Sequence, residues 1–229
     1  MPGDKPARAG NGATDNGDEL TWQAQKSAMT RDKILEAAVD CFINLGYTNV
    51  TTAKVASAAG VSRGAMLHHF PSKTELIHAA TEYLHGKLIE DFTSRVKSIP
   101  NNLKGKKYRR AGLDAYWDHL SSDLFMAYHE LCIAGRTDPE LKGILESTTV
   151  EFDQHTREST MALFNEWTDH GERFLLAMDV TKFLMEGMAV GQMVSNRDAR
   201  VKRLMNYLGD RLEEIFEEGG SSAIGRHSR

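Results

Sequence analysis

The feature that most limits the fold of this chain is a sharp break between two short helical patterns. The first pattern follows the cap signal Thr51-Thr52, and Gly60 ends it, because glycine tolerates a positive φ. Ser62 caps the second pattern, and Pro71 stops it, because the residue before a proline is pushed out of the helical region. The sequence therefore predicts two short helices joined by a tight turn.

The two short helices are expected to cross steeply and to pack closely. Ala56 and Ala59 are small enough for a close approach, and Val61 and Met66 then fill the crevice between the helices. The outer face of the second helix is short enough to enter the major groove of DNA. That face carries Ser62, Arg63, Ala65, Leu67 and His68. Such an arrangement is typical of a DNA-binding helix-turn-helix.

Helical periodicity continues on both sides of the motif. Upstream, an apolar stripe at spacings of three and four runs between a cap at Thr30 and a left-handed end at Gly46. The stripe consists of Ile34, Leu35, Ala38, Phe42 and Leu45. Downstream, Ser72 to Glu75 form a capping box that opens a longer fourth helix.

The rest of the chain has the helical period and no sustained two-residue alternation. We expect a loop over residues 100–105 and helices over residues 108–134, 139–144, 148–167, 175–195 and 198–218. The basic cluster from Lys104 to Arg110 is expected to be a solvated loop. The predicted fold class is all-α, with an N-terminal three-helix helix-turn-helix DNA-binding domain and a C-terminal helical bundle.

Composition limits the environment in which the chain works. The formal net charge of −4 does not favour nucleic acid, but only a narrow face needs to be positive. Cys41 and Cys132 lie in apolar-periodic stretches and are expected to be buried thiols in a reducing compartment. No apolar run approaches the length of a membrane span, and the N-terminal stretch lacks the apolar centre of a signal peptide. We therefore expect a cytoplasmic protein without a membrane partner.

Motifs of common catalytic sites are missing from the sequence. It contains no His-Glu-x-x-His, no phosphate-binding loop and no nucleophile elbow. His68 and His69 are adjacent on a helix and point about 100° apart, so they are poorly placed to share a metal ion. We expect no catalytic residue, metal or cofactor, and a helical enzyme is the alternative class.

Residues 30–76 resemble the DNA-binding domain of the tetracycline-repressor (TetR) family. The resemblance rests on the order and spacing of Leu45-Gly46-Tyr47, Val55-Ala56, Ala59-Gly60-Val61-Ser62 and His69-Phe70-Pro71-Ser72-Lys73. The remaining two-thirds of the chain match the family only in being helical. The resemblance implies a repressor that binds a palindromic operator as a homodimer and is released by a small apolar effector. An activating or effector-independent regulator is the alternative.

The resemblance also implies roles for individual residues. The hydroxyl and backbone N–H of Thr52 would bind a phosphate. Arg63 would pair with guanine O6 and N7, unless it is a solvated surface charge, and His69 and Lys73 match phosphate-binding positions. The full predicted DNA-binding set is Thr51, Thr52, Ser62, Arg63, Gly64, Ala65, Leu67, His68, His69 and Lys73.

The sequence departs from the family pattern at Leu67 and His68, where the family usually has aromatic residues. Leu67 cannot donate to a phosphate, so its contact is apolar or its side chain faces inward. His68 is a weaker donor near neutral pH unless it is protonated. Gly64 and Ala65 are expected close to the groove, where a small residue permits approach.

Aromatic, histidine and methionine side chains in the C-terminal half are candidates for an effector pocket between helices. The candidates are Tyr116, Trp117, Phe125, Met126, His129, Phe152, His155 and Phe183. Plain core packing is the alternative for each of them. The ten methionines favour a pliable cavity for a bulky apolar effector.

Two stripes near the C-terminus predict the dimer interface. One stripe runs from Val180 to Gly191 and includes small residues. The two helices that carry these stripes, contributed by each subunit, would form a four-helix interface. The other stripe consists of Met205, Leu208, Leu212, Ile215 and Phe216.

These patterns divide the chain into four regions. They are a disordered tail over residues 1–27, the helix-turn-helix domain over residues 28–75, a ligand-binding and dimerisation domain over residues 76–218 and a flexible tail over residues 219–229. Lys5 and Arg8 either belong to a solvated tail or form a mobile arm near DNA.

Overall fold

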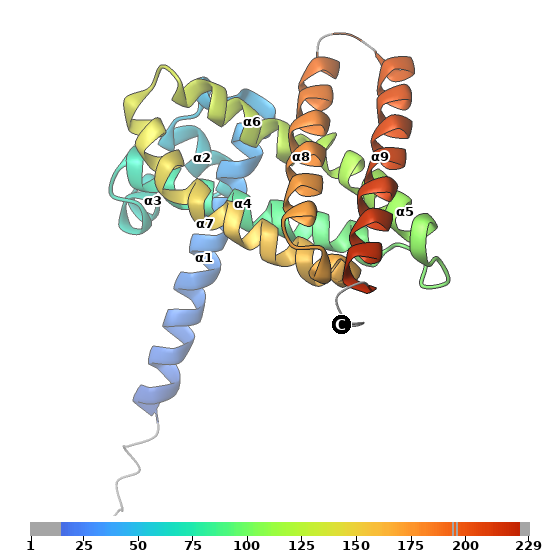
Figure 1. The fold of residues 1–229 in the computed structure, drawn as a ribbon. Helices are drawn as coiled ribbons and strands as arrows, with labels where there is room; N and C mark the ends of the chain where they lie inside the picture. Colours follow the sequence, from blue (N-terminus) through green and yellow to red (C-terminus); the bar gives the residue numbers. More distant parts are fainter. Residues whose placement is uncertain (1–14, 194, 196, 225–229) are drawn as a thin grey trace, which may run out of the picture.

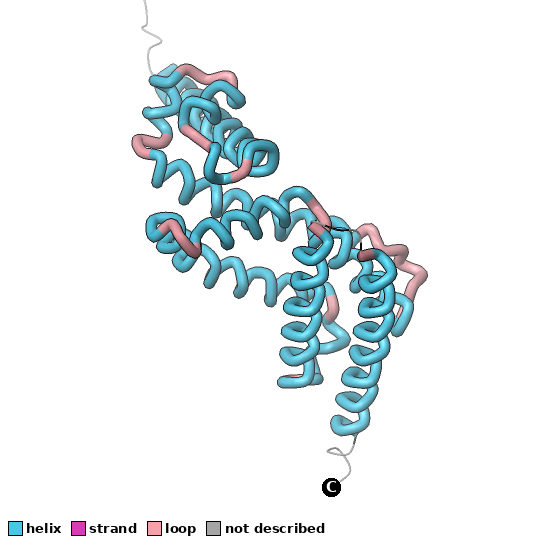
Figure 2. Tube along the Cα trace, turned by 90° about the horizontal axis from the view of Figure 1, so that it is seen from above, coloured by secondary structure: helices cyan, strands magenta, loops and turns pink. Residues whose placement is uncertain are grey.

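A computed structural model describes residues 15–193, 195 and 197–224 of the chain. These residues form nine α-helices and two short 3₁₀ helices, and no strand occurs among them (Figures 1 and 2). The prediction of an all-α fold is confirmed.

Five elements make up the N-terminal part of the chain. They are α1 (Asp15–Leu45), the 3₁₀ helix η1 (Tyr47–Asn49), α2 (Thr52–Ala59), α3 (Arg63–His69) and α4 (Lys73–Lys97). The predicted helix end and cap are present: Gly60 ends α2 in the left-handed region with φ 63°, and Ser62 caps α3. Ser72 caps α4, where its Oγ accepts the backbone N–H of Glu75 at 3.1 Å.

The first helix begins at Asp15 rather than at Thr30, so the predicted disorder of residues 15–27 is wrong. Residues 1–14, with Lys5 and Arg8, lie outside the described residues. Figure 1 shows the N-terminal half of α1 projecting from the body, and Trp22 and Met29 in it are exposed. Because the buried half of α1 already meets the cost of helix nucleation, a polar segment can extend the helix without an apolar stripe.

Six elements make up the C-terminal part. They are α5 (Gly105–Leu120), α6 (Asp123–Gly135), α7 (Pro139–Leu163), the 3₁₀ helix η2 (Asn165–His170), α8 (Glu172–Gln192) and α9 (Asp198–Ile224). Figure 1 shows α8 and α9 packed side by side at the edge of the molecule away from α2 and α3.

The C-terminal helix boundaries differ from the predicted ones, most clearly in three places. The helix predicted over residues 108–134 is broken before Ser122, whose Oγ accepts the backbone N–H of Phe125 and so caps α6. The break predicted before Thr148 is absent: α7 is continuous there, and the Ser147 and Thr148 hydroxyls donate to the Ile144 carbonyl within the helix. The last helix reaches Ile224, so residues 219–224 are helical instead of a flexible tail.

The basic cluster from Lys104 to Arg110 is not a solvated loop. It begins α5 and faces α9, where Arg109 forms ion pairs with Glu213 and, through η2, with Glu166. Lys106 lies 3.7 Å from Asp210. The cluster therefore fixes α5 against the last helix by charge pairing.

A continuous apolar core joins the two halves of the chain. Phe42 on α1, Leu84 on α4 and Leu131 on α6 are all essentially inaccessible to solvent and belong to this core. The long helix α4 packs against α1 at one end and against α5 and α7 farther along. In the part of the chain that the structure describes, no helix is both long and apolar enough to span a bilayer.

Candidate DNA interface and effector cavity

The helix α3 presents a short outer face. Its inner side is held by Met66, which is 1% exposed, and by Phe70 just beyond its end. Arg63 and His68 on the other side are exposed. Leu67 is 44% exposed, so of the two orientations expected for it the structure shows the outward one.

Two of the predicted contact residues also serve as helix caps. The Thr51 hydroxyl accepts the backbone N–H of Lys54 at 3.3 Å, and the Ser62 hydroxyl accepts that of Ala65 at 3.1 Å. Each hydroxyl proton is left to donate to an acceptor such as a phosphate oxygen. The N-terminal turns of α2 and α3 also keep unpaired backbone N–H groups, which favour an anion.

None of the ten predicted DNA-binding residues is buried. Seven are exposed, namely Thr51, Ser62, Arg63, Gly64, Leu67, His68 and Lys73, whereas Thr52, Ala65 and His69 are half-buried. Residues 28–75 carry five Lys or Arg against four Asp or Glu, while the whole chain has a net charge of −4. This region is therefore the less acidic part of the molecule, as phosphate binding requires.

A further cation stands near the end of α3. Burial, followed by His68 and Arg31, lowers the pKa of His69, so its imidazole is neutral near pH 7. The Arg31 guanidinium lies 5.3 Å from the centre of the Phe70 ring. Sequence reasoning missed Arg31, because its nearness to Phe70 at the end of α3 depends on how α1 packs.

The helix-turn-helix is fastened to the C-terminal part through Tyr47. Its backbone N–H donates to Glu130 Oε1 of α6 at 3.1 Å, and its hydroxyl donates to Asp138 Oδ2, the cap of α7, at 2.8 Å. The Lys73 ammonium lies 5.4 Å from the centre of the Tyr47 ring. We call these contacts the Tyr47 junction. Gly46 adjoins it, and a Cβ added there would lie 2.5 Å from Glu130 Oε1.

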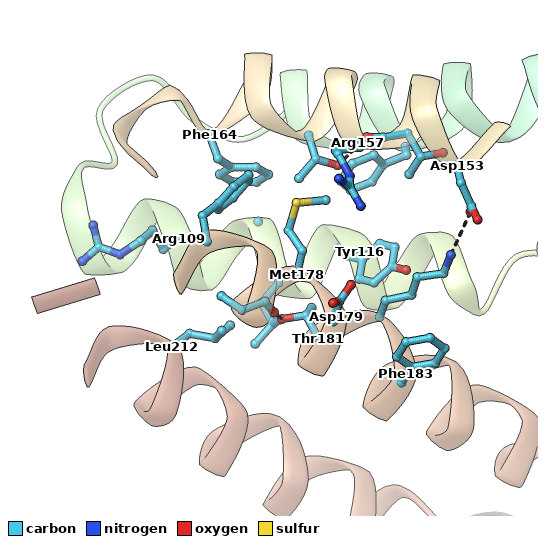
Figure 3. Close-up of a pocket in the computed structure, with 18 residues that line it drawn as sticks. Arg109, Tyr116, Asp153, Arg157, Phe164, Met178, Asp179, Thr181, Phe183 and Leu212 are labelled. Atoms are coloured by element: carbon cyan, nitrogen blue, oxygen red, sulfur yellow. Dashed lines mark hydrogen bonds and ion pairs between the residues drawn. The ribbon is translucent and has the colours of Figure 1, made fainter. Parts of the chain in front are cut away.

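A cavity of about 300 Å³ lies between α5, α7 and α8, with α4 and α9 at its ends (Figure 3). Its lining is mainly apolar and includes Phe92, Tyr116, Phe164, Phe174, Met178 and Leu212. Gly112 lets Phe164 lie against α5, because a Cβ at position 112 would approach the Phe164 ring to 2.6 Å. The size and lining are those of a site for a small organic molecule.

Most polar groups around the cavity already have partners. Lys182 forms an ion pair with Asp153 at 2.9 Å, and Arg109 is held by Glu213. The Thr160 and Thr181 hydroxyls donate to backbone carbonyls of their own helices. The Thr156 hydroxyl is buried and has no hydrogen-bond partner among the described residues.

The predicted effector residues are divided between the cavity and its surroundings. Tyr116 and Phe183 line the cavity. Trp117, Phe125, Met126 and Phe152 belong to the core or pack against it. His129 is half-buried and stacks 6.2 Å from Phe125, whereas His155 is exposed on α7. The sequence did not identify Thr156, Arg157 or Met178, because which side of each helix faces the cavity depends on how the three helices are rotated.

An unpaired apolar surface runs along α8 and α9. Leu176, Val180 and Phe183 are exposed on α8, and Leu204 and Tyr207 are exposed on α9. The apolar stripe predicted on the last helix faces the interior of the same chain and not this exposed surface. Met205 and Leu208 are buried within the chain, and Ile215 and Phe216 pack near Phe174.

Comparison with known proteins agrees with this geometry. The family described as bacterial regulatory proteins, tetR family, matches residues 34–80 of the chain. An uncharacterised HTH-type transcriptional regulator of Mycobacterium tuberculosis (strain ATCC 25618 / H37Rv) is 26% identical over 168 residues, which are 73% of this chain and 85% of the relative. The HTH-type transcriptional regulator CymR of Pseudomonas putida is 32% identical over 126 residues, which are 55% of this chain and 61% of CymR.

A solved structure extends the likeness to the C-terminal part. The multidrug binding protein EbrR, crystallised with imidazole, superposes with a TM-score of 0.56 at 14% sequence identity. The match covers 81% of this chain and 93% of EbrR. At this identity the likeness establishes a shared fold.

Proposed function

We propose that this chain, whose residues 34–80 match the tetR family of bacterial regulatory proteins, works as a dimeric repressor that a small molecule releases from a palindromic operator. The observation that carries the proposal is the pairing of an outward-facing α3 with a mainly apolar cavity in the same chain. Binding to the chromosome would place the protein in the cytoplasm.

The DNA-binding step would use α3 as the recognition helix. Arg63 stands at its first position with an exposed side chain, where a guanidinium can pair bidentately with a guanine. Thr51, Thr52, His69, Lys73 and the additional Arg31 would contact phosphates on either side. Phosphate contacts would position α3, and the base contacts would select the sequence.

The dimer would form through the exposed apolar surface of α8 and α9. Leu176, Val180 and Phe183 recur on α8 at spacings of four and three, and each is more than 40% exposed. Gly187 on the same helix has open space around its Cα, so a partner helix can approach there. A two-fold axis at this surface would repeat α3 on the partner, and the operator would then contain two inverted half-sites.

The release step would pass along α7. This helix of 25 residues is about 37 Å long, and it connects the cavity wall at Thr156 with the Tyr47 junction at Asp138. A ligand that favours one position of α7 would shift the population of helix-turn-helix positions through Tyr47. EbrR, which has the same fold, is described as a multidrug binding protein, and this supports a small-molecule site.

A reporter experiment tests the proposal. A duplex that the chain retains from a random pool is placed between a promoter and a reporter gene, and the chain is expressed in the same cells. We expect the wild type to lower reporter output and Arg63→Ala to restore it. A rise in output would favour the activator alternative, and no change in either strain would contradict regulation through this site.

A further inference from the structure

The cavity wall formed by α7 contains a cation in the middle of its inner stripe. Asp153, Arg157 and Thr160 line the cavity at spacings of four and three, so they share one face of α7. Thr156, about 100° around the helix from Arg157, and Phe164, just beyond the end of α7, also line it. Figure 3 shows the Arg157 side chain extending from α7 toward the side chains of α8. Arg157 therefore borders the cavity, and its side chain is exposed to solvent.

Arg157 differs from the other two cations that line the cavity. Lys182 and Arg109 are both neutralised by carboxylates, at Asp153 and Glu213. Asp153 lies one turn before Arg157 on the same face, but its carboxylate is engaged by Lys182. Within the described residues, no carboxylate lies within ion-pair distance of Arg157.

Two hydroxyl groups of the cavity lining also have no hydrogen-bond partner among the described residues. The Thr156 hydroxyl is buried and unpaired, which costs free energy unless an acceptor arrives. The Tyr116 hydroxyl makes no hydrogen bond to any described residue, and its ring lines the same cavity. The cavity thus offers three hydrogen-bond donors and mainly apolar walls.

Two other acidic groups lie on α8. Asp179 also lines the cavity, but it is exposed and lies on the side of α8 that also carries Leu176 and Phe183. Glu186 is not part of the lining, and burial raises the pKa of its carboxyl. The inner stripe of α7 is therefore the part of the site best suited to an anion.

We propose that the cavity takes a small apolar carboxylate, with its carboxylate on Arg157 and Thr156 and its one or two rings among the aromatic side chains. The size follows from volume, because a cavity of about 150 Å³ accommodates one benzene ring and this one holds about 300 Å³. A guanidinium binds a carboxylate bidentately, which fixes the orientation of the rings. This proposal rests on the proposed function, of which it specifies the effector.

Calorimetric titration of the full-length protein tests the ligand class with three compounds that share one ring system. They are 2-naphthoate, 2-naphthamide and 2-naphthylmethylammonium. We expect 2-naphthoate to bind at least tenfold more tightly than the amide, and the ammonium compound to bind most weakly. Tighter binding of the ammonium compound, equal binding of acid and amide, or no binding at all would overturn the proposal.

Variants of the cavity residues test whether 2-naphthoate binds at the inner stripe of α7. Arg157→Gln should abolish the preference for acid over amide, and Thr156→Val should weaken both compounds about equally. Arg136→Gln, an exposed arginine outside the cavity lining, is the control and should keep the preference. Thermal melts of each variant show whether it is folded. A preference that survives Arg157→Gln, or is lost in Asp179→Asn instead, would contradict the assignment.

DNA binding measured on the same samples separates the two proposals. If the chain binds DNA but 2-naphthoate does not bind, the carboxylate site is wrong and the repressor proposal stands. If 2-naphthoate binds with the expected preference but leaves DNA affinity unchanged, the site is supported and release by this ligand is contradicted. If the protein binds no DNA, the proposed function fails whatever the titration gives.

Discussion

At the scale of single residues, the proposed DNA contacts are of two kinds. In the proposed complex Arg63, in the first turn of α3, would reach base edges, whereas Lys73, which begins α4 beside Tyr47, would reach a phosphate. Base contacts discriminate among sequences, and phosphate contacts bind all sequences alike. Substitutions of the two residues should therefore weaken DNA binding in different ways.

Arg63→Ala should weaken binding to the selected duplex by about 1–3 kcal/mol and relax specificity at one base position. Lys73→Ala should weaken binding to every duplex equally and flatten the dependence on salt by about one unit of slope. Fluorescence anisotropy over a series of salt concentrations measures both effects. Unchanged affinity in the Arg63 variant, or a sequence-selective loss in the Lys73 variant, would contradict these roles.

A buried histidine gives the fold a dependence on pH. His85 is 6% exposed, stacks on Phe152 at 4.4 Å, and has no partner for Nε2 among the described residues. Burial lowers its pKa to about 4, against a small opposing effect of Asp153. Because the unfolded chain binds this proton more readily, the contribution of His85 is full above about pH 6.5 and is lost as the pH falls toward 4.

The free energy of unfolding should therefore fall by roughly 1–2 kcal/mol between pH 7 and pH 5 on account of His85. His85→Phe keeps a ring of similar shape against Phe152 and removes the titrating group. The decrease in the free energy of unfolding between pH 7 and pH 5 should therefore be smaller in the variant by the contribution of His85. Urea unfolding at fixed protein concentration measures the difference. Equal losses in the variant and the wild type would exclude His85 as a source of the dependence.

At the scale of helices, capping and glycine signals in the sequence were sufficient to predict where a helix begins or ends. Gly60 and the caps Ser62 and Ser72 gave the correct ends of α2, α3 and α4, because each acts within its own turn. The N-terminal half of α1 was not predicted to be helical, because a solvated extension of a packed helix needs no apolar stripe. The break at Ser122 was hidden by apolar residues on both sides, which keep helical spacing through it.

The Tyr47 junction leads to a prediction at this scale. Gly46 has φ 71° and ψ 153°, a conformation that is strained for any other residue, and a Cβ there would meet Glu130. Gly46→Ala should therefore destabilise the fold by about 1–3 kcal/mol. The loss should be smaller in a Glu130→Ala background, because the side chain that the new Cβ meets is gone.

Urea unfolding of the single and double variants measures this coupling. Gly86→Ala is the matched control, since Gly86 lies inside α4 with nothing within 4 Å of an added Cβ. That change should stabilise the protein by about 0.5–1 kcal/mol. Equal costs of Gly46→Ala in both backgrounds would show that Glu130 does not press on the turn, and the strain alone would remain.

At the scale of the whole molecule, the sequence predicted the class of protein better than its surfaces. The apolar stripe of the last helix was correctly seen, but Met205 and Leu208 point into the chain and Tyr207 points out. A period of 3.6 residues shows that a helix is amphipathic and does not say which neighbour covers its apolar side. The same ambiguity put Trp117 and Phe125 among the pocket candidates, although they pack in the core.

The exposed surface of α8 gives a prediction about assembly. Leu176→Glu places a charge on a side chain that is 55% exposed, so it should leave the subunit folded but disrupt the dimer. Sedimentation velocity should show a monomer, and DNA affinity should fall at least tenfold. Val150→Glu on α7, where Val150 is 69% exposed, should remain a dimer. A dimer that persists in the Leu176 variant would place the interface elsewhere.

The central claim is that two copies of α3, related by a two-fold axis, read one DNA site. The most direct test is to sequence the duplexes that the wild-type chain retains from a random pool. We expect an inverted repeat whose half-sites lie about one helical turn or more apart, roughly 10 base pairs from centre to centre or beyond. A single unrepeated motif, a direct repeat or no enrichment at all would contradict it.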